Sequence, residues 1–255
     1  MIIVKVPNAM GALGKNSETR QAPDAIVKKI NPPKSVVIEN AEIVPFDLEK
    51  TNENISNMAR TVFWLSSEKA LFLGGDHSIT YPVFKEFSKR FSKPALIVLD
   101  AHIDCYRNFN PPSNAFVIRT LIEERILKPD DVFFVGARIV SEKDLAFAKS
   151  KRIKYFTTKK TKEHLQELKR RLRAFVLEHD AVYLSIDFDV FDPEVVPGSG
   201  YKVPNGLQKK QVLDLVKLIE KTGKLRCTDI VEINPSFDVG EKTVALAAEL
   251  IRLLE

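Results

Sequence analysis

Short apolar runs alternate along this chain with longer segments whose apolar residues recur at helical spacing. The apolar runs are continuous, as is typical of strands that helices cover on both faces of a sheet. We expect strands at residues 2–6, 35–38, 70–73, 95–99, 132–135, 181–186 and 227–233. The segments between them predict helices at residues 54–67, 81–91, 141–151, 208–221 and 240–254.

This alternation predicts an α/β fold, a three-layer α/β/α sandwich with a mostly parallel central sheet. Ser141, with Asp144 three residues later, is a capping-box start for one helix. Trp64 lies at helical spacing among apolar neighbours and is expected in the core. No Ser/Gly-rich linker or repeat period interrupts the pattern, so residues 1–255 are predicted to form one domain.

Composition narrows the function classes. A hydrophobic fraction of 44% with 29% charged residues is typical of a soluble globular chain rather than a disordered one. The net charge of +5 raises the question of nucleic-acid binding. However, the densest basic cluster, residues 159–173, has the spacing of a solvated helix face, and no aromatic-rich basic motif accompanies it. We therefore expect no nucleic-acid partner.

Cysteine content and hydropathy point to the cytoplasm. Cys105 and Cys227 are the only cysteines and are far too few for a disulfide framework, which favours a reducing compartment. The apolar run at the N-terminus is too short for a signal-peptide core, and no apolar stretch approaches the length of a membrane span. The sequence predicts a cytoplasmic protein without a membrane partner.

Polar clusters follow three of the predicted strands, where ligands bind in α/β sheets. The first, GGDHS at residues 74–78, contains His77, although Asp76 or Ser78 would also fit a glycine turn with a helix cap. The second is DAHID at residues 100–104, and the third is SIDFDVFDP at residues 185–193.

The clusters have the chemistry of a metal site. Side chains at alternate positions of an extended segment point to one side, so Asp100, His102 and Asp104 should converge. Asp187 and Asp189 should share a face in the same way, and carboxylates brought together inside a fold are costly without a cation between them. Four aspartates and two histidines exceed the needs of one tetrahedral zinc ion, and no thiolate set accompanies them. We expect two divalent ions, manganese first, which acidify a water molecule for hydrolysis.

The three clusters also resemble the three signatures of the ureohydrolase family, which includes arginase, agmatinase and formiminoglutamase. Members of this family hydrolyse guanidino or amidino C–N bonds at a dimanganese centre. The resemblance extends to RQAPDAIVKKI at residues 20–30, VPGSGYKVPNGLQKKQV at residues 196–212 and DIVEINPSFD at residues 229–238. It covers nearly the whole chain in the order of the family.

The resemblance implies a role for each matching residue. Glu232 would pair with the guanidinium or amidinium group of the substrate, and Asp104 would pass a proton to the departing amine. It also implies a homo-oligomer, a trimer or hexamer. One Mn²⁺ would be bound by His77, Asp100, Asp104 and Asp187, and the other by His102, Asp100, Asp187 and Asp189.

The substrate remains open among small guanidino or amidino cations. The Ser/Thr/Asn-rich stretch with which arginases bind an amino-acid carboxylate is reduced here to Asn108, Asn110 and Ser113. This favours agmatine, with arginine next. Tyr201 and Lys202 also replace the small residue and proline that are usual in the Gly/Pro loop of the family.

The chain departs from the family at one further point. Asn114 and Ala115 occupy the positions of a His-Gly pair whose histidine shuttles protons. Asn114 is expected to contact the substrate but cannot titrate near neutral pH. His164 and His179, which are expected on a solvent-facing helix, cannot obviously replace that histidine.

Three interpretations of this departure stay open. The chain is an enzyme that works more slowly or at higher pH, because general acid–base help is worth about 10²–10⁴-fold. Alternatively, its substrate has a leaving group that needs no such help. In the third interpretation, the chain is a metal-binding relative with little or no turnover that serves in assembly or regulation.

Overall fold

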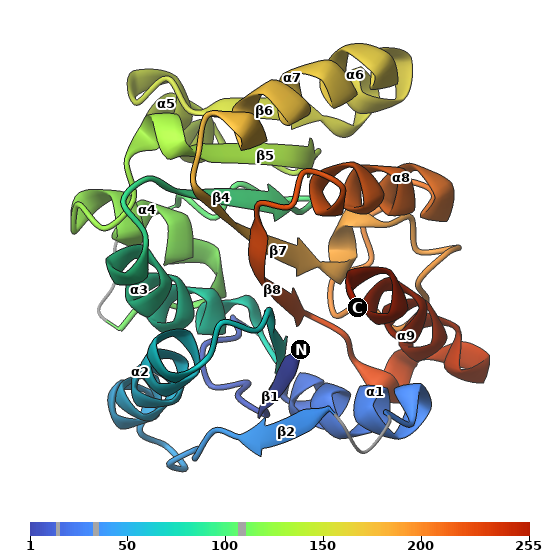
Figure 1. Cartoon of the computed structure of the whole chain (residues 1–255). Coiled ribbons are helices and arrows are strands. Elements are labelled where there is room, and N and C mark those ends of the chain that lie inside the picture. The colour runs from blue at the N-terminus through green and yellow to red at the C-terminus, as the bar shows by residue number, and fades with distance from the viewer. Residues whose placement is uncertain (14–15, 33–35, 107–110) are drawn as a thin grey trace.

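The structure is a computed structural model that describes residues 1–13, 16–32, 36–106 and 111–255. Its centre is an eight-stranded sheet in the order β2-β1-β3-β8-β7-β4-β5-β6, and neighbouring strands are parallel throughout (Figure 1). The strands are β1 (Ile2–Val6), β2 (Val37–Asn40), β3 (Ala70–Gly74), β4 (Pro94–Leu99), β5 (Val132–Ala137), β6 (Lys154–Thr157), β7 (Ala181–Asp187) and β8 (Leu225–Val231).

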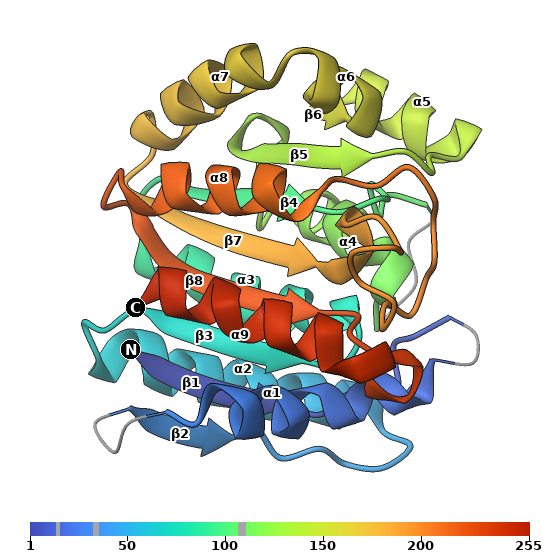
Figure 2. The same cartoon turned by 90° about the vertical axis from the view of Figure 1, so that its right-hand side faces the viewer.

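Helices cover both faces of the sheet and confirm the three-layer prediction. Figure 2 shows α1, α8 and α9 in front of the sheet, and Figure 1 shows α2, α3 and α4 on the opposite face. The α-helices are α1 (Ala22–Ile30), α2 (Leu48–Leu65), α3 (Thr80–Arg90), α4 (Val117–Glu123), α5 (Glu142–Ser150), α6 (Thr158–Glu163), α7 (Leu165–Leu177), α8 (Lys209–Glu220) and α9 (Lys242–Leu254).

The core consists of two apolar layers, one on each face of the sheet. One layer packs strand residues such as Leu71 and Ile97 against α1, α7, α8 and α9. The other packs their neighbours Phe72 and Val98 against α2, α3 and α4. Because successive strand residues point to opposite faces, a strand buried on both sides must be apolar at every position. This explains the continuous apolar runs.

The predicted elements are largely confirmed, with differences at the sheet edges. The strand expected at residues 35–38 is β2 at Val37–Asn40, and Ser35 lies outside the described residues. Strand β6 was not predicted, because its sequence KYFT is short and half-exposed at the end of the sheet. The capping box of α5 forms between Ser141 and Asp144.

Two predictions about single side chains are wrong. Trp64 is 55% exposed and lies under the guanidinium group of Arg90, at 5.4 Å, while its neighbour Phe63 is buried. His179 is buried rather than solvent-facing, and its ring nitrogens contact the carbonyl oxygen of Phe175 and the carboxylate of Asp131. The basic segment 159–173 forms α6 and most of α7. Among the described helices, none combines the length and hydropathy needed to cross a bilayer.

Candidate active site

The residues with metal-binding chemistry lie at the carboxyl ends of β3, β8, β7 and β4, four neighbouring strands in the middle of the sheet. In a parallel sheet these ends lie along one edge, so segments distant in sequence meet there. His77 begins the 3₁₀ helix η2 (His77–Ile79) after β3, and Glu232 follows β8 directly. Asp100, His102 and Asp104 follow β4, Asp187 ends β7, and Asp189 lies in the 3₁₀ helix η5 (Phe188–Val190).

His77 faces three carboxylates. Its Nδ1 atom lies 2.8 Å from Oδ2 of Asp104, 3.2 Å from Oδ2 of Asp100 and 3.5 Å from Oδ2 of Asp187. All four side chains are at most 9% exposed. The sequence prediction that these residues come together is therefore met by the geometry.

His102 faces a second group of carboxylates beside the first. Its Nδ1 atom lies 2.8 Å from Oδ2 of Asp189 and 3.4 Å from Oδ1 of Asp100. Backbone N–H groups orient this group, since Ala101 donates to Asp189 Oδ1 at 2.8 Å and Asp189 donates to Asp187 Oδ1 at 2.8 Å. Asp100 thus lies between the two histidines.

The backbone reaches this convergence by a different route from the predicted one. The segment after β4 bends at Ala101 and His102, and Asp104 has a φ of 47°. Asp189 is in a 3₁₀ turn and does not share a strand face with Asp187. A non-glycine residue with positive φ is strained, and such strain is concentrated at functional sites.

The donor set fits two divalent cations. Ligand atoms of His77, Asp100 and Asp187 lie within 4.8 Å of one another, and so do those of Asp100, His102 and Asp189. The buried atoms Nδ1 of His77, Oδ2 of Asp100 and Oδ2 of Asp189 make no hydrogen bond despite these close approaches. Buried polar atoms without hydrogen bonds are rare in native structures and can mark an ion site.

Electrostatics point the same way. Burial and the neighbouring carboxylate of Asp100 raise the pKa of Asp104 to about 6. Burial and the carboxylate of Asp189 raise the pKa of Asp187 well above its usual value. Burial lowers the pKa of His102, but the carboxylates of Asp189 and Asp100 outweigh it and raise this pKa to about 12. The crowded carboxylates thus favour any nearby positive charge.

A buried network orients His77 from behind. Its Nε2 atom lies 2.9 Å from Oγ of Ser185, which donates to Oδ1 of Asp229 at 2.6 Å. Thr80 and Tyr183 donate their hydroxyl groups to Oδ2 of Asp229 at 2.7 and 2.6 Å. Because Ser185 gives its proton to Asp229, it accepts one from Nε2, which leaves the Nδ1 lone pair facing the carboxylates. Partners of this kind fix the tautomer of metal-binding histidines.

Glu232 lies across the site with a φ of 60° and 1% exposure. Its Oε1 atom accepts hydrogen bonds from the backbone N–H of His77 at 3.0 Å and from Nδ2 of Asn114 at 3.1 Å. Its Oε2 atom accepts one from Nδ2 of Asn16 at 2.7 Å. Burial, with the nearby carboxylate of Asp76, raises the pKa of Glu232 to about 8.

These residues surround a cavity of about 250 Å³. The hydroxyl group of Tyr201 donates to the carbonyl oxygen of Leu13, and the backbone N–H of Leu13 donates to Oδ1 of Asn114 at 3.3 Å. The predicted substrate residue Asn114 is therefore part of the cavity wall, and the predicted Asn108 and Asn110 lie outside the described residues. The described lining residues are Leu13, His77, His102, Asp104, Asn114, Ala115, Asp187, Asp189, Tyr201 and Glu232.

Several residues that shape the site were not predicted. Ser185 could have been recognised, because it precedes Asp187 by two positions on the same strand and so points to the same face. Asp229, a carboxylate within an apolar strand, was a weaker signal. Asn16 gave none, since its contact with Glu232 joins residues 216 positions apart. Arg138 donates to the carbonyl oxygens that follow β7, including that of Asp189 at 2.6 Å.

Comparison with known proteins agrees with this geometry. Residues 1–254 match the model of the arginase family. The chain is 32% identical to an agmatinase of Blochmanniella floridana and 30% identical to one of Bacillus anthracis, over 72% and 71% of its length. These matches span only 58% and 61% of the two relatives. The formimidoylglutamase structure from Bacillus subtilis superimposes with a TM-score of 0.92 at 22% identity and covers 99% of this chain and 85% of its own. The chain belongs to the arginase family.

Proposed function

We propose that this chain is a metal-dependent hydrolase that cleaves a C–N bond of a small guanidino or amidino cation, with agmatine favoured and arginine next. One observation carries the proposal: three strand ends bring six metal-competent side chains to one wall of the cavity, and the buried carboxylate of Glu232 faces the same space. The agmatinase relatives support this choice of substrate class.

Two Mn²⁺ ions suit the oxygen-rich, imidazole-containing donor set better than one tetrahedral zinc ion. When bound, they would acidify a water molecule and so supply the nucleophile. Asp100 and Asp187 would serve both ions, because each lies within reach of both groups of ligands. The full set is His77, Asp100, His102, Asp104, Asp187 and Asp189.

Glu232 would bind the amidinium group of the substrate. Its carboxylate is buried and held rigidly by three donors, yet it lines the cavity and can accept further hydrogen bonds from a cation. A planar N–H fork opposite a fixed carboxylate also orients the reacting carbon.

Asp104 would carry the proton to the departing amine. It lines the cavity, and its raised pKa of about 6 is close enough to neutrality for proton transfer in both directions. Asn114 cannot share this work, because an amide does not titrate. Its amide group instead holds Glu232 and the backbone of Leu13 in place.

The lining of the cavity favours a substrate without a carboxylate tail. None of the described residues that line it is Lys or Arg, so a carboxylate would find no cationic partner there. The apolar wall of Leu13, Ala115 and Tyr201 suits an aliphatic chain instead. This is the physical reason for placing agmatine before arginine.

The setting of the enzyme is part of the proposal. Both free cysteines, Cys105 and Cys227, are buried, which suits a reducing cytoplasm. We infer a role in polyamine metabolism if agmatine is the substrate, and a homo-oligomeric assembly such as a trimer or hexamer.

The proposal is tested by product release from a panel of substrates. Protein reconstituted with Mn²⁺ is assayed between pH 7 and 10 for urea from agmatine, arginine and guanidinobutyrate, and for formamide from formimidoyl amino acids. Asp100→Asn serves as the control that loses the metals. Release from one substrate, abolished in the control, supports the enzyme. No release from any of them, with two ions bound, would contradict it and favour a relative that binds metal without turnover.

A further inference from the structure

The central sheet ends in two short strands, β2 and β6, each paired on one side only. Unpaired backbone groups on an edge strand can accept another chain, and proteins usually blunt such edges. Here each edge strand forms a wall of a surface cavity, one of about 620 Å³ beside β2 and one of about 550 Å³ beside β6. The proposed activity assigns neither of them a role.

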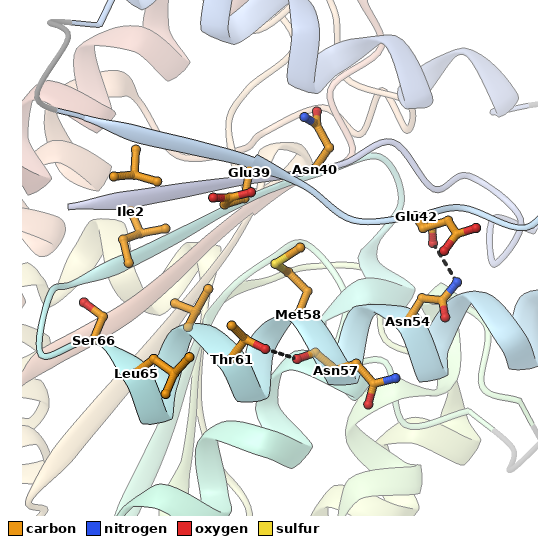
Figure 3. Close-up of a pocket in the computed structure, with 12 residues that line it drawn as sticks. Ile2, Glu39, Asn40, Glu42, Asn54, Asn57, Met58, Thr61, Leu65 and Ser66 are labelled. Carbon is orange, nitrogen blue, oxygen red and sulfur yellow. Dashed lines mark hydrogen bonds between the residues drawn. The ribbon is translucent and has the colours of Figure 1, made fainter.

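The cavity at β2 has an apolar floor and an acidic rim. Figure 3 shows it between β2 and α2, with Ile2 and Met58 at its base and Glu39 and Glu42 along the strand side. Leu65, at the end of α2, is 83% exposed. Neither glutamate forms an ion pair with any residue that the structure describes. We call this surface the acidic edge.

The cavity at β6 has an aromatic floor and a basic rim. Four exposed cations line it, Arg152, Lys154, Lys160 and Arg171, against one carboxylate, Glu178. Aromatic rings hold some of these cations in position: Nζ of Lys160 lies 4.7 Å from the ring centroid of Phe156, and Nζ of Lys154 lies 5.2 Å from that of Phe175. We call this surface the basic edge.

We propose that the acidic edge of one copy of this chain docks on the basic edge of a second copy. Charge decides which edges can meet: two acidic edges repel, two basic edges repel, and only the unlike pair attracts. Apolar surface on the acidic edge and aromatic surface beneath the basic edge are then covered on contact. A contact between two different surfaces of one chain is head-to-tail, and its repetition forms a closed ring or an open filament.

Charge reversal tests this pairing directly. Glu39→Lys with Glu42→Lys reverses the acidic edge, and Arg152→Glu with Lys160→Glu reverses the basic edge. No side-chain hydrogen bond or ion pair of these four residues is found within the described part of the chain, so the fold should tolerate each change. Light scattering should show the mass of a multimer for the wild type and that of one chain for either variant. The variant with all four changes should recover the multimer, because its edges are complementary again.

A control pair, Glu194→Lys with Glu255→Lys, changes the net charge of the chain by the same amount on exposed sites elsewhere and should leave the mass unchanged. Circular dichroism verifies that every variant is folded. A wild-type chain that stays monomeric, reversed variants that keep the wild-type mass, or a fourfold variant that stays monomeric would each overturn the proposal.

Disulfide trapping gives a second readout that needs no charge reversal. Because both native cysteines are buried, Glu39→Cys and Lys160→Cys introduce the only accessible thiols among the described residues. A mixture of the two variants should form a cross-linked dimer under mild oxidation, and either variant alone should not. Cross-linking of Glu39→Cys with itself would show a symmetric contact and refute the head-to-tail arrangement. These readouts do not involve catalysis, so they stand or fall separately from the proposed function.

Discussion

Replacement of Ser185 by alanine tests whether the buried network behind His77 prepares a metal ligand. The hydroxyl group of Ser185 lies 2.9 Å from Nε2 of His77 and 2.6 Å from Oδ1 of Asp229. Without it, Nε2 loses its acceptor in a site where His77 is 1% exposed. An unsatisfied buried group costs about 1–3 kcal/mol, which corresponds to a Tm about 2–12 °C lower. Loss of such a partner typically weakens metal binding by about 10–100-fold.

The assay combines thermal unfolding with calorimetric titration of Mn²⁺. Thr161→Val is a matched control, since Thr161 is fully buried and its hydroxyl group has no hydrogen-bond partner. Removal of that unpaired group should leave stability unchanged or raise it. The reasoning is refuted if Ser185→Ala binds Mn²⁺ as tightly as the wild type, or if the two variants lose the same stability.

Two further predictions concern the substrate carboxylate and the metals. Asn16→Leu removes the donor 2.7 Å from Oε2 of Glu232 and should raise KM by about 10–150-fold with a smaller change in kcat, because a hydrogen bond to a charged group contributes about 1.5–3 kcal/mol. Asn52→Leu, at a buried amide without partners, should leave KM unchanged, and equal effects of the two substitutions would contradict the role of Asn16. Chelator-treated protein should lose thermal stability as pH rises from 5 to 8, because the folded-state pKa values of Asp104 and Glu232 are raised to about 6 and about 8, so the folded chain binds more protons than the unfolded chain across this window. Mn²⁺ should raise Tm more at pH 8 than at pH 5, since protons compete with the ions for the carboxylates, and a Tm that rises with pH after chelation would refute the sign.

Much of the fold follows from burial. A strand such as β4 is apolar at every position because helices cover both of its faces, and this pattern is visible in the sequence. The half-exposed strand β6 has no such pattern, and only its pairing with β5 reveals it. Trp64 was misplaced for a related reason: helical spacing identifies a helix but cannot separate a core position from its exposed neighbour at the helix end.

The candidate site was predictable to the extent that its chemistry is local. Asp100, His102 and Asp104 stand together in the sequence, so their clustering is evident even though the backbone that joins them is bent rather than extended. The contact of Asn16 with Glu232 depends on the packing of the N-terminal loop against the end of β8. Such a contact carries no sequence signature, because neither residue has the other within a shared element.

The central claim is that two ions held by these side chains make the chain a C–N hydrolase. The most direct test measures bound Mn²⁺ per chain and urea release from agmatine in the same preparation, for the wild type and for Asp100→Asn. Asp100 approaches both histidines, so its substitution should reduce both metal content and turnover. The account predicts two ions and urea release for the wild type, with both lost in the variant. Urea release that persists in Asp100→Asn, or a wild-type chain that binds fewer than two ions, would contradict it.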